Sequence, residues 1–273
     1  MTDEIRGLGR LPTFLIVGAM RCGTTSLNGY LRQHPQVAMG TPKEIHFFDR
    51  EFDRGLDWYR SHFTTDPTVV AVGEATPNYL FDLVAPSRIA ATLPDAHLVI
   101  LLRNPVDRSY SHYWHDRSRD KVDVTFPEAV SAELEGSDRY RYVDRSRYRG
   151  QVERLYASVD RARVLVETFE DLTADPGTVF ASVCRFIGVD DGVRPESLGD
   201  TINAYTEFRS VRVRQLSKGM PKGMGRLVGR LNQRQAAGYP PMDEETRRML
   251  AAEFAESNAG LDDLVGRQLP VWA

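Results

Sequence analysis

Short apolar runs alternate with stretches of helical spacing along most of the chain. The runs are three to six residues long, which is short for a helix, and several end at glycine or at a polar residue. Such runs are typical of strands that are buried on both faces of a sheet. We therefore predict strands at residues 14–17, 37–39, 69–72, 97–102 and 164–168.

Between the strands, apolar residues recur at helical intervals. Residues 24–31 form one such stretch, which Pro35 closes because the residue before a proline leaves the helical region. Further helices are predicted at residues 87–93 and 175–187, and a last one from Asp243 onward. Because strands and helices alternate, the sequence predicts an α/β fold with a mostly parallel sheet flanked by helices on both faces. Ligands bind at the carboxyl ends of the strands in such sheets.

The composition predicts one domain. The chain has 273 residues, of which 41% are hydrophobic, so it can bury a full core over residues 1–273, with a flexible N-terminus at 1–11. The segment 209–238 differs, because its part from 209 to 234 holds eight basic residues and no acid. Two interpretations stay open for this segment: a solvated, mobile connector, and an ordered lid that binds anions.

Several classes of protein are disfavoured by charge and hydropathy. The apolar run at 98–102 is too short to span a bilayer, and the N-terminus has no apolar core of a secretion signal, so we expect a cytoplasmic protein. Cys22 and Cys184 lack metal-ligand spacing and should be reduced; no metal is expected. The net charge of −3 disfavours a dedicated nucleic-acid binder.

The turn after the first strand has the spacing of a phosphate-binding loop. It reads GAMRCGTT from Gly18 to Thr25, and in such loops backbone amides and a helix N-terminus converge on an anion. An ATP-binding loop has a lysine where this chain has Thr24, so a triphosphate would lose its main charge partner. A shorter 5′ group that Arg21 can reach fits better. A tight turn without any ligand is the alternative.

A second anion site is predicted after the strand at 97–102. Arg103 stands at the carboxyl end of that strand, Asn104 is a plausible N-cap, and Pro105 takes the first helical position. Ser111 then lies about two turns into the helix. An arginine and a hydroxyl in this arrangement can clamp a second phosphate by charge-assisted bonds. The alternative is an arginine paired with a carboxylate and a serine that faces solvent.

Together the two elements resemble the sulfotransferase family that uses 3′-phosphoadenosine 5′-phosphosulfate (PAPS). The family patterns are GxxKxGTT and RxPxxRxxSxY, and the second is matched by Arg103, Pro105, Arg108, Ser111 and Tyr113. The resemblance is strongest to the branch that contains the heparan sulfate sulfotransferases and their bacterial relatives. It continues through PKEIHFFD, EATPNYL, ETFEDLTADP and YPPMDEETRRML, and so covers nearly the whole chain in family order.

The resemblance implies a P-loop-type fold and assigns the residues that bind the donor. The 5′-phosphosulfate would be held by Arg21, Cys22, Gly23, Thr24, Thr25 and Ser26, and the 3′-phosphate by Arg103 and Ser111. Adenosine 3′,5′-bisphosphate (PAP) would be the product, and no metal would be needed. Arg21 replaces the usual loop lysine and would stabilise the departing phosphate, although a guanidinium cannot donate a proton.

A general base for the acceptor hydroxyl is expected in the segment TPKEIHFFD. If this segment is extended, Glu44 and His46 point to the same face and can look into one cleft. The resemblance favours Glu44 as the base and places Lys43 near the transferring sulfuryl group. His46 either orients the site or packs in the core, and the alternative for Glu44 is an ion pair with Lys43 or Arg21.

The acceptor is expected to be weakly charged. By the resemblance, Thr76, Pro77 and Tyr79 would contact it, and Ala75 stands where polysaccharide-acting members usually have a lysine. Losing that cation favours a small-molecule acceptor such as a lipid, a glycoside or a phenolic metabolite. The segment 138–151, rich in tyrosine and arginine, either borders the acceptor or forms a solvated face.

The leading hypothesis is a PAPS-dependent sulfotransferase that moves a sulfuryl group to a hydroxyl. The first alternative is a kinase-like phosphoryl transferase, which would need magnesium and prefer ATP. The second is a nucleotide-sensing module without catalysis, in which Glu44 has no role.

Overall fold

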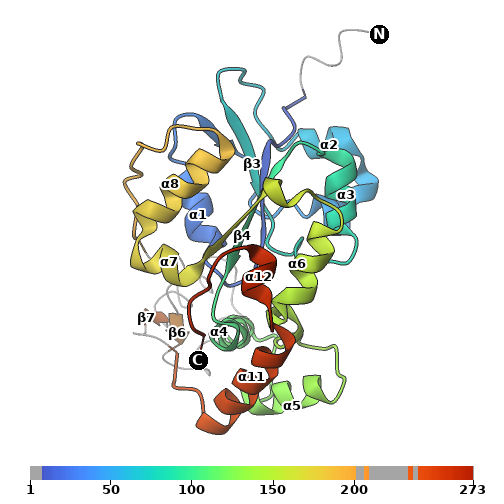
Figure 1. Ribbon diagram of the computed structural model, residues 1–273, viewed down its shortest axis with the longest axis vertical. Coiled ribbons are helices and arrows are strands. Elements are labelled where there is room, and N and C mark those ends of the chain that lie inside the picture. Colours follow the sequence, from blue (N-terminus) through green and yellow to red (C-terminus); the bar gives the residue numbers. More distant parts are fainter. Residues whose placement is uncertain (1–7, 201–205, 209–232, 236–238, 273) are drawn as a thin grey trace, which may run out of the picture.

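A five-stranded parallel sheet forms the centre of the protein (Figure 1). The computed structural model describes residues 8–200, 206–208, 233–235 and 239–272. Across the sheet the strands lie in the order β2–β3–β1–β4–β5. Their bounds are β1 Phe14–Gly18, β2 Val37–Met39, β3 Ala71–Ala75, β4 His97–Leu102 and β5 Val164–Thr168. The predicted α/β fold with a parallel sheet is confirmed.

Helices cover both faces of the sheet. Figure 1 shows α1, α7 and α8 on one side of it and α2, α3 and α6 on the other. The first group comprises α1 Thr24–Leu31, α7 Phe169–Ala174 and α8 Pro176–Ile187. The second comprises α2 Leu56–Arg60, α3 Ala85–Thr92 and α6 Tyr148–Tyr156. One large apolar core, which includes the buried residues of β1 and β4, joins these layers.

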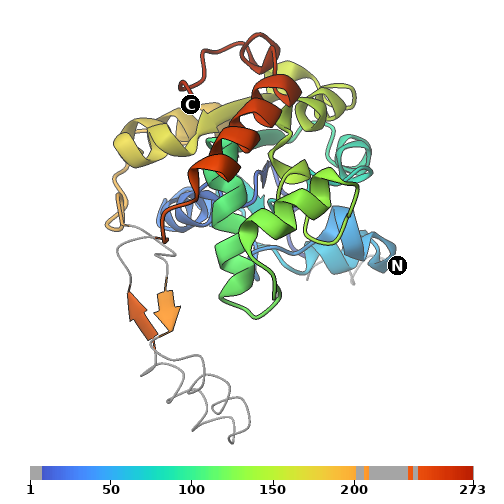
Figure 2. The ribbon, with the colours of Figure 1, turned by 90° about the horizontal axis from the view of Figure 1, so that it is seen from below.

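A second group of helices lies beyond the carboxyl ends of the strands. It comprises α4 Pro105–Arg117, α5 Phe126–Leu134, α11 Glu244–Ser257 and α12 Leu261–Val265. A separate apolar cluster around Val106, Phe126, Tyr142 and Phe254 packs α4, α5 and α11 together. Figure 2 shows this group from below, with α11 crossing α4. Of this group, α4 faces the space into which the strands of the sheet point.

Short helical turns and one small ribbon complete the structure. The turns are η2 Phe47–Glu51, η3 Phe52–Arg54, η4 Asp144–Ser146 and η5 Arg161–Arg163. The ribbon pairs β6 Thr206–Phe208 with β7 Gln233–Gln235 in antiparallel register. Most of the basic segment 209–238 and residues 1–7 of the N-terminus lie outside the described residues, so the connector-or-lid alternatives do as well. None of the described helices has the length and apolar character that crossing a membrane requires.

The third strand begins and ends later than predicted, at Ala71–Ala75 instead of 69–72. Gly73 and Glu74 are residue types that are uncommon in a buried strand. Phe14 of β1 pairs with Gly73, and the missing side chain of Gly73 leaves space for the Phe14 ring. Glu74 is buried because three hydroxyl groups donate to its carboxylate. Partners distant from one another in sequence therefore decide this strand.

The helix boundaries follow the capping signals. The Asn104 side chain accepts from the amides of Val106 and Asp107 at 2.9 and 3.2 Å, so α4 begins at Pro105 as predicted. Asp175 and Asp243 cap α8 and α11 in the same way. The predicted helix at 87–93 is observed at 85–92.

Candidate active site

A cleft of about 1220 Å³ lies where the strands end, between the sheet and helix α4. Its walls come from the loop after β1, the segment 43–50, the turn after β3, Arg103 after β4, and α4 itself. The residues that follow neighbouring parallel strands therefore meet in one place, as the topology requires. Both predicted anion sites and the predicted base open into this cleft.

The loop after β1 presents a helix N-terminus to the cleft. Helix α1 starts at Thr24, its N-cap is Gly23 with φ 88°, and no side chain caps it. The amides of the first turn are thus open to an anion. Thr24, Thr25 and Ser26 all line the cleft, as the sequence predicted.

Gly23 has two independent reasons to be glycine. Its φ lies in the left-handed region, and a Cβ there would come within 2.8 Å of Leu172 Cδ2 and 3.1 Å of Phe169 Cδ2. We expect Gly23→Ala to lower the free energy of unfolding by about 1–3 kcal/mol, measured by urea titration. Gly136→Ala is the control, because Gly136 has φ 105° but open space around it. Equal losses in the two variants would show that the collision is irrelevant.

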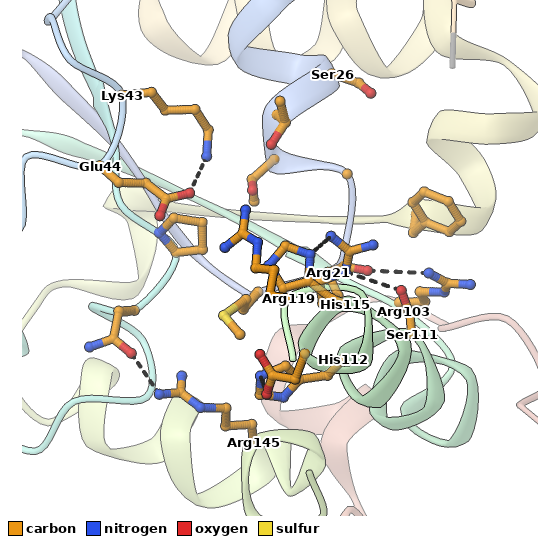
Figure 3. A pocket seen from close by; sticks show the side chains of 18 of the residues that line it. Arg21, Ser26, Lys43, Glu44, Arg103, Ser111, His112, His115, Arg119 and Arg145 are labelled. Atoms are coloured by element: carbon orange, nitrogen blue, oxygen red, sulfur yellow. Dashed lines mark hydrogen bonds and ion pairs between the residues drawn. The ribbon is translucent and has the colours of Figure 1, made fainter. Parts of the chain in front are cut away.

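Arg21 reaches toward α4 (Figure 3). Its Nε donates to Ser111 Oγ at 3.1 Å, Nη1 lies 3.1 Å from His115 Nδ1, and Nη2 donates to the Tyr239 hydroxyl at 3.3 Å. Burial, and then the charge of Arg21, lowers the pKa of His115 to about 4. His115 is therefore neutral at neutral pH, and its Nδ1 accepts from Arg21. Arg21 is thus held at the boundary between the two predicted anion sites.

Arg103 lines the same cleft and is not neutralised. It donates through Nη1 to the carbonyl of Arg21 at 3.3 Å, and its Cζ lies 4.4 Å from the centre of the Phe169 ring. Within the described residues it forms no ion pair with a carboxylate. Ser111 does not face solvent, because it is buried and shares its hydroxyl with Arg21 and Tyr239. Both alternatives considered for this pair of residues are therefore wrong.

Cys22 is a packing residue in this structure. Its side chain is fully buried, its Sγ lies 3.9 Å from the Tyr148 hydroxyl, and burial raises the pKa of its thiol to about 11. The thiol does not line the cleft. Any contact of Cys22 with the donor must therefore come from its backbone.

Glu44 and His46 line the cleft together, although the segment is not extended. Both residues have left-handed φ values, 64° and 60°, and the buried Ile45 lies between them. His46 Nε2 is 3.9 Å from Glu44 Oε2, and Lys43 Nζ forms an ion pair with Glu44 Oε1 at 2.5 Å. The side chains of Glu44 and His46 are therefore brought close together by two left-handed residues, and not by the alternation of an extended segment.

His46 is oriented by a buried acid. Its Nδ1 lies 2.9 Å from Oδ2 of Asp49, whose side chain is 1% exposed. The hydrogen bonds from His46 and Asn78 lower the pKa of Asp49 although burial opposes them. With Nδ1 bonded to Asp49, the Nε2 of His46 is directed toward Glu44. Of the two alternatives for His46, this geometry favours orientation over packing.

Thr76 and Tyr79, two of the three predicted acceptor-contact residues, do not line the cleft. Both side chains are buried, and their hydroxyls donate to Glu74 at 2.6 and 2.7 Å. Burial raises the pKa of Glu74 although these hydroxyls donate to its carboxylate. Thr76 and Tyr79 therefore shape the wall from behind. Of the three predicted contact residues, Pro77 lines the cleft.

Several residues of the cleft were not predicted from the sequence. His115 follows Ser111 by four residues, so helical spacing from Ser111 was the signal that could have found it. Asn78 lies in the motif EATPNYL and Arg145 in the segment 138–151, so the sequence pointed to both regions, but their hydrogen bond could not be predicted because 67 residues separate them. Five residues of the segment 138–151 line the cleft: Asp138, Arg139, Tyr140, Arg141 and Arg145. Within the described ranges, no cluster of three histidine, cysteine or acidic residues could hold a metal.

Comparison with known proteins identifies the family. The model of the sulfotransferase domain family matches residues 11–239. The human bifunctional heparan sulfate N-deacetylase/N-sulfotransferase 3 is 29% identical over 282 residues, and the mouse enzyme 1 of the same name is 31% identical. These alignments cover 96% of this chain but only 31% of each relative, so the chain spans about a third of their length.

A solved sulfotransferase structure has the same fold as this chain and matches it over nearly the full length of both. The crystal structure of a sulfotransferase from Alicyclobacillus acidocaldarius has a TM-score of 0.75 and 29% identity, and the match covers 96% of this chain and 99% of that one. The family model, the curated relatives and the shared fold agree with the loop and the strand-end arginine described above. The chain belongs to the sulfotransferase family.

Proposed function

We propose that the protein transfers a sulfuryl group from PAPS to a hydroxyl of a small-molecule, lipid or carbohydrate acceptor. The observation that carries this proposal is the pair of anion sites in one cleft: the open N-terminus of α1 and the unneutralised guanidinium of Arg103. Family membership favours sulfuryl transfer over the phosphoryl transfer of the kinase-like alternative. A donor with charges at both its 5′ and 3′ positions matches two separated anion sites.

On the donor side, the loop would bind the 5′-phosphosulfate and Arg103 the 3′-phosphate. Amides of the first turn of α1, with the hydroxyls of Thr25 and Ser26, supply donors to the 5′ group. Negative charge grows on the oxygen between phosphorus and sulfur as the sulfuryl group departs, and Arg21 is the cation that we assign to it. Ser111 and His115 hold the guanidinium of Arg21 in place.

On the acceptor side, we assign Glu44 as the general base. The acceptor oxygen attacks sulfur, its proton passes to the Glu44 carboxylate, and the bond from sulfur to the bridging oxygen breaks to leave PAP. The ammonium group of Lys43 forms an ion pair with the Glu44 carboxylate and so offsets its negative charge. His46, oriented by Asp49, places its Nε2 3.9 Å from Oε2 of Glu44 on the other side.

The first test is metal-independent binding. Purified protein in excess EDTA is expected to bind PAP in isothermal titration calorimetry, and adding magnesium should leave the affinity unchanged. ATP should bind more weakly, because the loop has no lysine for the β- and γ-phosphates. Binding of ATP that depends on magnesium and exceeds that of PAP would instead support the kinase-like alternative.

Turnover separates an enzyme from a nucleotide sensor. A screen of hydroxylated acceptors with isotopically labelled PAPS, read by mass spectrometry, is expected to yield a sulfated product. Tight PAP binding with no product on any acceptor would support the sensor.

The cytoplasmic location, the single domain over the whole chain and the absence of nucleic-acid binding stay predictions. Cell fractionation tests the location, limited proteolysis tests the single domain, and a DNA-binding assay tests the absence of nucleic-acid binding.

A further inference from the structure

A half-buried cation lies on the side of the cleft away from the α1 N-terminus. Arg145 comes from the η4 turn and enters the cleft wall beside helix α4, where Figure 3 shows it far from Ser26. Its Nη2 donates to Asn78 Oδ1 at 2.8 Å, and its Cζ lies 4.1 Å from the centre of the Phe81 ring. Stacking on an aromatic ring and one amide contact hold the guanidinium in a fixed orientation.

No carboxylate among the described residues pairs directly with this cation. Arg145 forms no ion pair with any residue in the described part of the chain. Burial, followed by the like charges of Arg108, Arg141 and Arg50, lowers the pKa of Arg145 to about 10. A half-buried charge that lines a cleft and has no ion-pair partner in the described residues is available to an anion that arrives with a ligand.

Asp116 is the acid that faces Arg145 most directly, and it is engaged elsewhere. Its Oδ2 accepts from the Tyr142 hydroxyl at 3.3 Å and lies 3.5 Å from His112 Nε2. Burial raises the pKa of Asp116, which weakens it as a counterion. The wider lining of the cleft agrees: it contains nine lysine and arginine residues but four acidic ones.

We propose that Arg145 binds an acidic group of the acceptor, a carboxylate or a sulfate ester, on the side of that molecule opposite its reacting hydroxyl. The inference rests on the proposed sulfuryl transfer and narrows its acceptor to acidic molecules. A guanidinium recognises such oxyanions through two parallel hydrogen bonds. Arg50 and Arg141, which also line the cleft, add positive charge around the same position.

A chain of hydrogen bonds connects this subsite to the assigned base. Asn78 accepts from Arg145 and donates through Nδ2 to Asp49 Oδ2 at 2.6 Å, and Asp49 in turn holds His46 beside Glu44. The distance between the acidic group, at Arg145, and the reacting hydroxyl, at Glu44, would therefore be fixed within one acceptor molecule. The sequence-based expectation of a weakly charged acceptor depended on Ala75, which is buried in β3 and does not line the cleft.

Matched acceptors test the subsite. The probes are 4-nitrophenyl β-D-glucuronide, the neutral 4-nitrophenyl β-D-glucoside, and the 6-sulfate of that glucoside. Wild-type protein loaded with PAP should bind the acidic probes at least tenfold more tightly than the neutral one in calorimetry. Arg145→Gln is expected to reduce this preference roughly tenfold to hundredfold, the worth of a hydrogen bond to a charged group, and to leave binding of the neutral probe unchanged. The two acidic probes distinguish a carboxylate from a sulfate ester.

Two controls keep the result interpretable. Arg185→Gln removes an equal charge from the surface of α8, where Arg185 pairs with Asp191, and should keep the acid preference. Arg145→Lys should retain part of the acid preference, and PAP affinity in both Arg145 variants should equal that of the wild type if they fold.

Equal binding of acidic and neutral probes by the wild type, or a preference that survives Arg145→Gln, overturns the proposal. Failure of PAP to bind would instead overturn the proposed function, and the probe preference would then be measured on the protein without PAP.

Discussion

Replacing Arg103 with alanine is expected to weaken PAP binding by about tenfold to hundredfold, the worth of a charge-assisted hydrogen bond. Arg103 lines the cleft, makes one contact at 3.3 Å with a backbone carbonyl, and has no carboxylate partner within the described residues. Its charge is therefore available to a phosphate. Calorimetry with PAP and with adenosine 5′-phosphate checks this, since the second ligand lacks the 3′-phosphate and should bind the variant and the wild type equally well.

Arg88→Ala is the matched control for this experiment. Arg88 also stacks on a phenylalanine, with its Cζ 4.4 Å from the Phe52 ring centre, and also donates to a backbone carbonyl, but it lies outside the cleft. Its loss should leave both affinities unchanged. If Arg103→Ala weakened the binding of PAP and adenosine 5′-phosphate by the same factor, Arg103 would act by supporting the loop at Arg21, and the assignment of the 3′-phosphate would be wrong.

The elements that carry local signals could be predicted from the sequence. The strands at 37–39, 97–102 and 164–168 and the helix at 24–31 have the predicted bounds, because apolar runs and capping residues decide them locally. The phosphate-type loop and Arg103 belong to this group as well. Each follows a strand directly, and the parallel topology then brings the strand ends together.

Features that depend on distant partners could not be predicted. Glu74 lies in a buried strand because hydroxyls from α2 and from the turn after β3 donate to it, and Thr76 and Tyr79, which supply two of these hydroxyls, do not line the cleft. Arg145 approaches Asn78 from 67 residues away in the chain. The turn with two left-handed residues around Ile45 has no glycine to signal it. These contacts shape the acceptor side, which explains why the donor side was the easier part to predict.

Replacing Glu44 with glutamine is expected to lower kcat by about a hundredfold or more, the range of general-base catalysis, while PAP affinity stays unchanged. The amide keeps the shape of the side chain but cannot take the proton of the acceptor hydroxyl. Glu44 lies on the open side of the cleft, with its side chain 45% exposed, so the change should not affect folding. Steady-state kinetics with labelled PAPS, on an acceptor found by the screen, measures the effect.

Comparison with His46→Asn decides which residue takes the proton. If Glu44 is the base, His46→Asn should lower kcat less, by about tenfold, because it removes only the orienting contact that Asp49 supports. Glu51→Gln is the control, since Glu51 is an exposed acid that pairs with Arg54 outside the cleft. A larger loss in His46→Asn than in Glu44→Gln would make the histidine the base, oriented by Asp49, because its Nε2 is directed toward the same part of the cleft and is able to accept a proton.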